Sequence, residues 1–386
     1  MNESILIKNA HVITPTAHWA QGWLLIRERQ ITLMGEGEPP SLDAGETIDA
    51  GGLTLLPGFI DVHAHGGVGH ETMDATPDAL RALARFYAQN GVTSFLATTW
   101  TESREAIMAA LEVVAELQGP QPDGANILGA HLEGPYLNVA KRGAQNPVHF
   151  RTADREEALA FLDLNVIRLL SVAPELEANH WLIGECIRRG ITVSAAHTTA
   201  TYEQMERAVI LGVTHATHTY NAMVGLSHRE PGTVGAVLTM PQIRCELIAD
   251  TIHVHPAAMK ILLAAKGREG VVLITDAVRG AGLGDGEYLI DERQVIVRDG
   301  AVRLSDGTLA GSTLTLNKGL YNFMRATGEP LNAVWQASSL NAARSIHIAA
   351  HKGSLEVGKD ADIVLVDEQI NVYLTIVEGQ IVYRKA

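Results

Sequence analysis

Apolar residues recur in short runs at both ends of the chain. Near the N-terminus one run surrounds Ile5, and a longer one at 23–34 is typical of a β-hairpin that turns at residues 28–30. Near the C-terminus, 362–367 and 380–383 show the same strand signals on either side of turn residues. Because both ends are rich in strand signals, we expect them to meet in one small β module.

The middle of the chain alternates strand patterns with helix patterns, which points to a parallel sheet. The first helix is clearly marked, since Thr76 is suited to cap it, Pro77 to begin it and Gly91 to end it. Other helices are expected over 103–117, 202–211 and 256–265. Strands are expected over 59–65, 92–97, 127–131, 166–172, 191–195, 213–216, 246–249 and 271–275. About eight strand–helix units result, the number that forms a TIM barrel.

These patterns predict an α/β fold, a distorted TIM (β/α)8 barrel over residues 58–347. Residues 1–57 and 348–386 are expected to form a small β-sandwich domain built from both termini. A chain of 386 residues suits a barrel of about 250 residues with an accessory module. With 46 % hydrophobic and 19 % charged residues, the chain can bury a large core and is not expected to be disordered.

The net charge of −14 argues against nucleic acid and anionic membranes as partners, since both require a basic surface. A small anionic ligand is not excluded, because a few arginines make a local positive pocket. We see no signal peptide and no run of about 18 apolar residues that would span a membrane. Cys186 and Cys245 have neither metal-site spacing nor the number for a disulfide framework, so we expect a soluble, cytoplasmic protein.

Histidine and carboxylate residues recur where the predicted strands end, and in TIM barrels the active site lies at that face. His63 and His65 are two residues apart and therefore share one face of a strand. The ends of four later strands are followed by Glu133, His197, His218 and Asp276. Imidazole and carboxylate together suit zinc or ferrous iron. The sequence therefore predicts a divalent metal site at the mouth of the barrel.

Each of these residues also has a simpler interpretation. A lone histidine is more often a packed or capping residue than a ligand, and Asp276 alone would be taken as a helix cap. The recurrence at five strand ends favours a metal site. His215 lies three residues before His218, so we expect it to face away and to be structural. His131 is expected two residues deeper than Glu133, as a partner of the ligands.

Longer motifs surround these residues. They are Pro57-Gly-Phe-Ile-Asp-Val-His-Ala-His-Gly-Gly67, His131-Leu-Glu-Gly-Pro-Tyr136, Thr217-His-Thr-Tyr-Asn-Ala-Met223, Leu273-Ile-Thr-Asp-Ala277 and Gly353-Ser-Leu-Glu-Val-Gly-Lys-Asp-Ala-Asp-Ile363. With them the chain resembles, over nearly its whole length, the N-acetylglucosamine-6-phosphate deacetylases of the amidohydrolase superfamily. The second and third motifs carry most of the specificity. The resemblance implies hydrolysis of the acetamide of N-acetylglucosamine-6-phosphate to glucosamine-6-phosphate and acetate, in amino-sugar catabolism or cell-wall sugar recycling.

The resemblance also implies roles for individual residues. Glu133, His197 and His218 would be the main metal ligands, and Asp276 the catalytic acid and base. His63 and His65 would hold a second metal, so that one or two ions, zinc or iron, bind per chain. The sugar phosphate would contact Ala144, Gln145, Asn221, Ala222, Arg229, His253 and a loop of Leu309, Ala310 and Gly311. Some family members have histidine in place of Gln145. A homodimer is implied as well, with His228 or Arg229 reaching the partner's pocket.

Four alternatives stay open at this point. The sister activity on N-acetylgalactosamine-6-phosphate differs by the orientation of one hydroxyl. A cyclic-amide hydrolase would need a carboxylated lysine, and no lysine follows a barrel strand, since Lys141 lies in a loop. A scaffold without catalysis would be expected to lack a ligand, and none is missing. A glycosidase would use Glu133 and Asp276 and would not need the histidines.

Overall fold

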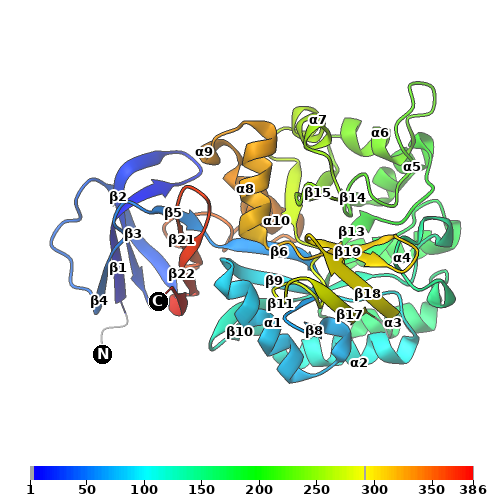
Figure 1. Ribbon diagram of the computed structural model, residues 1–386, viewed down its shortest axis with the longest axis horizontal. Coiled ribbons are helices and arrows are strands. Elements are labelled where there is room, and N and C mark those ends of the chain that lie inside the picture. Colours follow the sequence, from blue (N-terminus) through cyan, green and yellow to red (C-terminus); the bar gives the residue numbers. More distant parts are fainter. Residues whose placement is uncertain (1–3, 291–292, 386) are drawn as a thin grey trace.

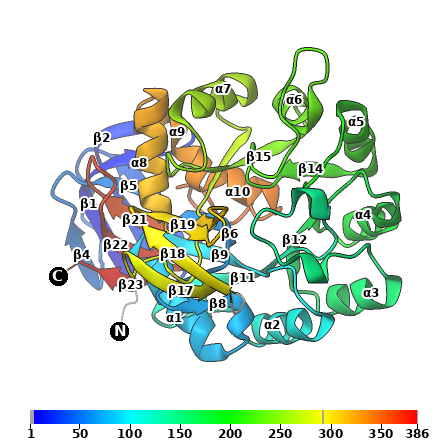
Figure 2. The same cartoon turned by 45° about the vertical axis from the view of Figure 1, so that its right-hand side comes forward.

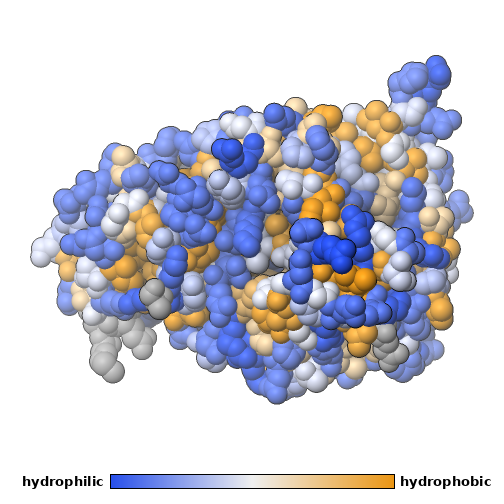
Figure 3. Space-filling view, viewed as in Figure 1, coloured by the Kyte–Doolittle hydropathy of each residue, from blue (hydrophilic) through white to orange (hydrophobic). Residues whose placement is uncertain are grey.

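The computed structural model describes residues 4–290 and 293–385. A small β module that holds both ends of the chain lies beside a larger α/β body (Figure 1). The space-filling view shows the two parts as one continuous molecule (Figure 3). No helix in the described part of the chain has the length and apolar character needed to cross a membrane.

Eight parallel strands form the centre of the larger body, and every strand expected there from the sequence is present. Their order in the sheet is β16-β15-β14-β13-β12-β11-β9-β6, and short β10 (Gly119–Gln121) pairs with β11. Their bounds are β6 (Phe59–Ala64), β9 (Val92–Thr98), β11 (Gly124–Glu133), β12 (Ile167–Val172), β13 (Thr192–Ala195), β14 (Val213–Ala216), β15 (Arg244–Ile248) and β16 (Val271–Ile274). Their side chains are buried almost throughout, as in parallel sheets covered by helices.

The two edge strands of this sheet, β6 and β16, meet at their carboxyl ends. The amide of Asp276 donates to the carbonyl of His63 at 2.9 Å, and the amide of His65 donates to the carbonyl of Ala277 at 2.9 Å. Deeper in, the Thr275 hydroxyl donates to the carboxylate of Asp61 at 2.6 Å. The described residues show no ladder of paired residues between β6 and β16. The strands are therefore gathered into a ring at the end that carries the site, while a fully closed barrel stays a prediction.

Helices cover the outside of the strands, as Figure 2 shows for α2 to α6. The helices are α1 (Pro77–Gln89), α2 (Arg104–Leu117), α3 (Arg155–Asp163), α4 (His180–Arg188), α5 (Tyr202–Leu211), α6 (Gly232–Thr239), α7 (Pro256–Lys266), α8 (Leu316–Thr327), α9 (Leu331–Val334) and α10 (Leu340–Ser345). Short 3-10 helices occur at Thr72–Asp74, Val139–Lys141, Pro147–His149, Glu177–Asn179 and Trp335–Ser338. The predicted cap is confirmed, since the Thr76 side chain accepts from the amide of Ala79.

The small module is an eight-stranded sheet that contains strands from both ends of the chain. Its order is β23-β22-β21-β5-β1-β2-β3, with β4 on β1, and β21 pairs antiparallel with β5. The bounds are β1 (Ser4–Ile13), β2 (His18–Arg27), β3 (Gln30–Glu36), β4 (Glu46–Asp49), β5 (Thr54–Pro57), β21 (Ile363–Val366), β22 (Val372–Val377) and β23 (Gln380–Arg384). The expected hairpin is present as β2 and β3. The pairing defines one sheet, so the second layer of a sandwich and the boundaries at 57 and 347 stay predictions.

A further sheet, which is antiparallel and inserted between β16 and α8, was not expected from the sequence. This insert sheet consists of β17 (Gly286–Ile290), β18 (Arg293–Arg298), β19 (Ala301–Leu304) and β20 (Leu309–Ser312). Residues 309–311, expected in a loop, therefore lie in a strand, because Leu309 pairs with Arg303 across a tight turn. A two-stranded ribbon, β7 (Gly66–Gly67) with β8 (His70–Glu71), follows β6.

A buried ion cluster joins the small module to the larger body. The ammonium of Lys352 lies 2.8 Å from Asp362, 2.9 Å from Glu378 and 3.0 Å from Asp360. The side-chain amide of Asn126, on β11, donates to the same Glu378 carboxylate at 2.6 Å. Lys352 is only 7 % exposed. A lysine that neutralises carboxylates in such a place is costly to remove, because the acids stay buried without their partner.

We expect the Lys352→Met variant to unfold at a clearly lower urea concentration than the wild type. Loss of one partner from a buried ion cluster costs about 3–5 kcal/mol of unfolding free energy. Urea denaturation followed by circular dichroism measures the shift. Lys260→Met, at an exposed position of α7, is the matched control and should unfold with the wild type. Equal midpoints for all three proteins would show that the cluster does not stabilise the junction.

Candidate functional site

The candidate site lies at the carboxyl ends of the parallel strands. Three of its residues lie two positions beyond the end of a strand and have left-handed backbone: His197 with φ of 41°, His218 with φ of 29° and Asp276 with φ of 50°. Residues with side chains rarely adopt this conformation, and in proteins it is concentrated at functional sites. The turn directs each side chain back over the strand ends, where it meets the others.

Glu133, His197 and His218 converge on one point. Oε1 of Glu133 lies 3.2 Å from Nε2 of His218 and 3.5 Å from Nε2 of His197. The two imidazole nitrogens are 3.1 Å apart. All three side chains are buried, and each offers one ligand atom within 4.8 Å of the others. Three donor atoms from three distant parts of the chain are thus close enough to share one cation.

The chemistry of these donors fits a divalent metal. Nδ1 of His197 must carry its proton, because it donates to the carbonyl of Lys141 at 2.7 Å. Nε2 of His197 therefore presents a lone pair to Glu133 and His218. Oε1 of Glu133 and Nδ1 of His218 have no hydrogen-bond partner in the described protein. Ligands of a tetrahedral zinc at about 2.0–2.1 Å lie about 3.3 Å from one another, which is close to the separations found here.

A second cluster shares Glu133 with the first. His63 and His65 project from the end of β6 with their Nε2 atoms 3.3 Å apart. Nε2 of His65 lies 3.4 Å from Oε2 of Glu133 and 3.2 Å from Oδ1 of Asp276. One oxygen of Glu133 thus faces the pair His197 and His218, and the other faces His65. His63, His65 and Glu133 also meet the distance criterion for a metal site.

Glu246, on β15, supports both clusters and was missed by the sequence analysis. It accepts a hydrogen bond from Nδ1 of His63 at 2.9 Å and from the backbone amide of His218 at 3.1 Å. Its other oxygen contacts Nε2 of His215 at 3.0 Å. Such a partner fixes the tautomer and the ring orientation of a ligating histidine. A carboxylate between the apolar neighbours Cys245 and Leu247 of a strand was the signal that points to it.

The expectation that His215 faces away from the site was wrong. His215 is fully buried in the interior and holds the carboxylate that orients His63. Strand alternation fails here because His218 lies beyond the end of β14 in left-handed backbone. His131 lies deeper, as expected. Its ring packs edge-on to His63 with centroids 4.6 Å apart, and burial lowers its pKa to about 3.

Carboxylates dominate the electrostatics of the two clusters. Burial lowers the pKa of His63, but the carboxylates of Glu133, Glu246 and Asp276 outweigh it and raise that pKa to about 10. Burial raises the pKa of Glu133, but the surrounding histidines, His63 foremost, hold it well below its ordinary value. The pKa of Asp276 is lowered by the same histidines, against the effect of burial. The carboxylates are ionised at neutral pH, and the clusters favour positive charge at their centre.

A pocket of about 170 Å³ opens over the clusters. Of the residues proposed from sequence to contact a substrate, seven line it: Ala144, Gln145, Asn221, Ala222, His253, Leu309 and Gly311. Ala310 instead packs into the core beneath the insert sheet. Arg229 is exposed on the segment before α6, which projects from the body of the molecule (Figure 1). None of the described arginines or lysines lines the pocket.

Contacts beneath the surface hold several pocket residues in place. The side-chain amide of Gln145 donates to Oε2 of Glu133 at 2.7 Å, and its oxygen accepts from the amide of Thr101 at 2.8 Å. Nδ1 of His253 donates to the carboxylate of Asp250 at 2.6 Å. Gln145 therefore lines the pocket and also holds Glu133, a candidate metal ligand, through a hydrogen bond.

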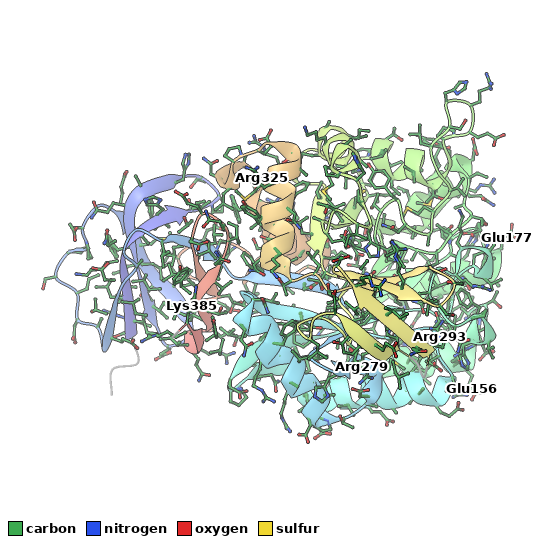
Figure 4. All side chains as sticks on the ribbon, viewed as in Figure 1. Glu156, Glu177, Arg279, Arg293, Arg325 and Lys385 are labelled. Atoms are coloured by element: carbon green, nitrogen blue, oxygen red, sulfur yellow. The ribbon has the colours of Figure 1, made fainter. Side chains whose placement is uncertain are left out.

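Arg279, labelled in Figure 4, fastens the loop after Asp276 to the ribbon after His65. Its guanidinium donates to the carbonyl of Gly69 at 2.6 Å and to Asp74 at 2.5 Å. The carboxylate of Glu71 lies 3.6 Å away. These bonds tie together the two segments that carry Asp276 and the His63–His65 pair.

Comparison with known proteins agrees with this geometry. The model of the amidohydrolase family matches residues 54–382. The N-acetylglucosamine-6-phosphate deacetylase of Vibrio furnissii is 42 % identical over 88 % of this chain and 86 % of its own. The N-acetylgalactosamine-6-phosphate deacetylase of Escherichia coli O157:H7 is 39 % identical over 85 % of this chain and 87 % of its own.

A solved structure extends the likeness to three dimensions. A variant of the Mycobacterium smegmatis N-acetyl-D-glucosamine-6-phosphate deacetylase, in complex with N-acetyl-D-glucosamine-6-phosphate, superposes with a TM-score of 0.91 at 30 % identity. The superposition covers 98 % of this chain and 99 % of that one. The matching family model, these relatives and the convergence of histidines and carboxylates at the strand ends lead to one conclusion: the chain belongs to the amidohydrolase family.

Proposed function

We propose that the protein hydrolyses the acetamide of N-acetylglucosamine-6-phosphate to glucosamine-6-phosphate and acetate. The observation that carries the proposal is the convergence of Glu133, His197 and His218 beside Asp276, at the floor of a pocket. The relatives from Vibrio furnissii and Mycobacterium smegmatis, which carry the name of this activity, support the choice of substrate. Both cysteines are free and buried, which fits the reducing cytoplasm, where amino-sugar catabolism or cell-wall sugar recycling would use the enzyme.

Two divalent ions, zinc or iron, fit the donors. The first would be held by Glu133, His197 and His218, and the second by His63 and His65 with Glu133 between the two. The contacts of Glu133 support this sharing. Its Oε1 lies 3.2 Å from Nε2 of His218 and 3.6 Å from Nε2 of His63, and its Oε2 lies 3.4 Å from Nε2 of His65. Imidazole nitrogen and carboxylate oxygen suit both metals. Bound there, a divalent cation would lower the pKa of water and polarise the acetamide carbonyl.

Asp276 is suited to move the proton. Its lowered pKa keeps it ionised at neutral pH, and it lines the pocket beside both clusters. As a base it would take a proton from the attacking water while the oxygen–carbon bond forms. As an acid it would return that proton to the amine nitrogen while the carbon–nitrogen bond breaks. One carboxylate thus serves both halves of the reaction, and acetate and the free amine leave.

The phosphate end of the substrate needs a cation that the pocket does not offer from its own described residues. We place the phosphate end beside His253, Asn221 and Ala222, which line the pocket. We propose that Arg229 of a second copy of the chain binds the phosphate in a homodimer. Its segment projects from the molecule and is hydrophilic in the space-filling view (Figure 3). A planar guanidinium gives two charge-assisted hydrogen bonds to phosphate.

Exposed apolar side chains of the larger body support dimerisation. They lie in segments that follow the strand ends or in the insert sheet, and they are Val139, Val148, Leu226, Leu283, Leu289 and Ile296. Val148 is 80 % exposed and Leu226 is 57 % exposed. A group of exposed apolar side chains often marks a contact surface. A partner placed there would also close the phosphate end of the pocket.

The second candidate is the same reaction on N-acetylgalactosamine-6-phosphate. The relative from Escherichia coli, at 39 % identity, favours it almost as strongly as the others favour the glucosamine substrate. A cyclic-amide hydrolase fits less well, because the ammonium of Lys141 donates to the carbonyl of Met223 at 2.9 Å and does not bridge the clusters. Comparing kcat/KM for the two sugar phosphates decides between the first two candidates.

We expect Glu133→Gln to lose bound metal from both clusters. The amide replaces the only carboxylate that the clusters share, and removal of even an indirect partner weakens metal binding by about 10–100-fold. Elemental analysis of purified, dialysed protein measures the content, and Glu112→Gln, at an exposed position of α2, is the control. If Glu133→Gln keeps the metal content of the control, the metal site lies elsewhere.

We expect Asp276→Asn to lower kcat by about 10²–10⁴-fold, the usual contribution of a general acid–base residue. The metal content should stay close to that of the wild type. Acetate release under saturating substrate gives the rate, and elemental analysis gives the content. Asp123→Asn, on the surface, should keep the wild-type rate. A variant with near-normal kcat would remove Asp276 from the mechanism.

We expect Arg229→Ala to raise KM for the sugar phosphate with a smaller effect on kcat, whereas Arg325→Ala, exposed on α8 (Figure 4), should behave as wild type. Co-expression of Arg229→Ala with Asp276→Asn tests action across the dimer. Mixed dimers hold one complete pocket, so the rate at low substrate should recover to about a quarter of wild type. No recovery would place Arg229 in its own chain's pocket or outside any pocket.

A further inference from the structure

Trp100 is a pocket residue to which the reaction above assigns no role. It follows β9, it lines the pocket, and it is 5 % exposed. Its indole stacks on the ring of His65 at a centroid distance of 3.9 Å and an angle of 14°. His65 in turn contacts Glu133 and Asp276. Only the ring of His65 therefore separates one face of the indole from Glu133 and Asp276, which would act on the scissile bond.

The position of Trp100 is firmly fixed. The next amide, that of Thr101, donates to Gln145, which also donates to Glu133. The indole packs with Ala144 and with the apolar core beneath the insert sheet. The indole, Ala144 and the Gln145 amide thus form one wall of the pocket, and the imidazole of His65 stacks on the indole.

This wall stands opposite the residues proposed to bind the sugar phosphate. Counting from β6, β9 is second and β14 is sixth in the order of the eight strands, so their ends face each other across the ring. Trp100 follows β9, and Asn221 with Ala222 follows β14. In the same way Ala144 and Gln145 follow β11, the third strand, and His253 follows β15, the seventh. Glu133, His218 and Asp276 line the same pocket.

The proposed binding roles set the orientation of an N-acyl amino sugar placed across these groups. Its sugar lies towards Asn221 and His253, and its amide lies at Asp276. The acyl chain is attached to the far side of the carbonyl carbon, so it must point at Trp100 and Ala144. We propose that Trp100 is a specificity-determining residue that limits the acyl group to acetyl or smaller. This inference rests on the proposed deacetylase function and names the part of the substrate that the indole reads.

The test compares N-acetyl-, N-propionyl- and N-butyrylglucosamine-6-phosphate as substrates. For the wild type, kcat/KM should fall by about tenfold or more with each added methylene, since an apolar wall discriminates by this amount. In Trp100→Ala the ratio of butyryl to acetyl kcat/KM should rise by about tenfold or more. Trp100→Leu keeps an apolar side chain in the core cluster and should show a smaller rise. Trp100→Leu replaces Trp100→Ala in the test if the alanine variant does not fold.

Trp181→Ala is the matched control. Trp181 lies on α4, where its indole N–H donates to the carbonyl of Ala153 at 3.2 Å, and its loss should leave the butyryl-to-acetyl ratio unchanged. Metal content is measured for every variant, because Trp100 also supports His65. A parallel loss of activity on all three substrates, with the ratio unchanged, overturns the proposal and leaves deacetylation intact. If the wild type releases no acetate from the acetyl substrate, the proposed function itself fails.

Discussion

Glu133 lies between two pairs of histidines, and the organisation of the site depends on that contact. Its two oxygens lie 3.2 Å from Nε2 of His218 and 3.4 Å from Nε2 of His65, in a place that water hardly reaches. Lone pairs and ionised oxygens packed this closely repel one another, and a cation at their centre removes the conflict. Two surrounding groups fit the same requirement. The carboxylate of Glu246 accepts the outer proton of His63, and the carbonyl of Lys141 accepts that of His197, so a bound cation would meet the inner nitrogen of each ring.

The sequence was sufficient for the framework because the framework follows periodic rules. Buried parallel strands are continuous apolar runs, and their ends can be located to within a residue or two, as for β9 and β16. The convergence of Glu133, His197 and His218 followed from that framework, since the carboxyl ends of neighbouring strands share one face. The motifs shared with the deacetylases then indicated which reaction the site catalyses.

The features that the sequence did not predict lie where the regular alternation of side chains or the apolar pattern breaks down. His215 was misplaced because left-handed backbone at His218 breaks the alternation of side chains. The insert sheet was missed because its strands are short and half exposed, and their partners are set by tight turns rather than by an apolar pattern. Trp100 carried no signal of its own, since a tryptophan after a strand is most simply a core residue. Its importance arises from the ring of His65, which only the fold places against it.

The meeting of β6 with β16 has a consequence for how such a protein can evolve. The bonds that gather the ring at this end are made by the main chain of His63, His65, Asp276 and Ala277, whereas the chemistry belongs to side chains at three of those positions. Replacing a side chain there leaves the main-chain bonds in place. New ligand sets can therefore be sampled by mutation without opening the scaffold, and a lineage can exchange one amide substrate for another while it continues to fold.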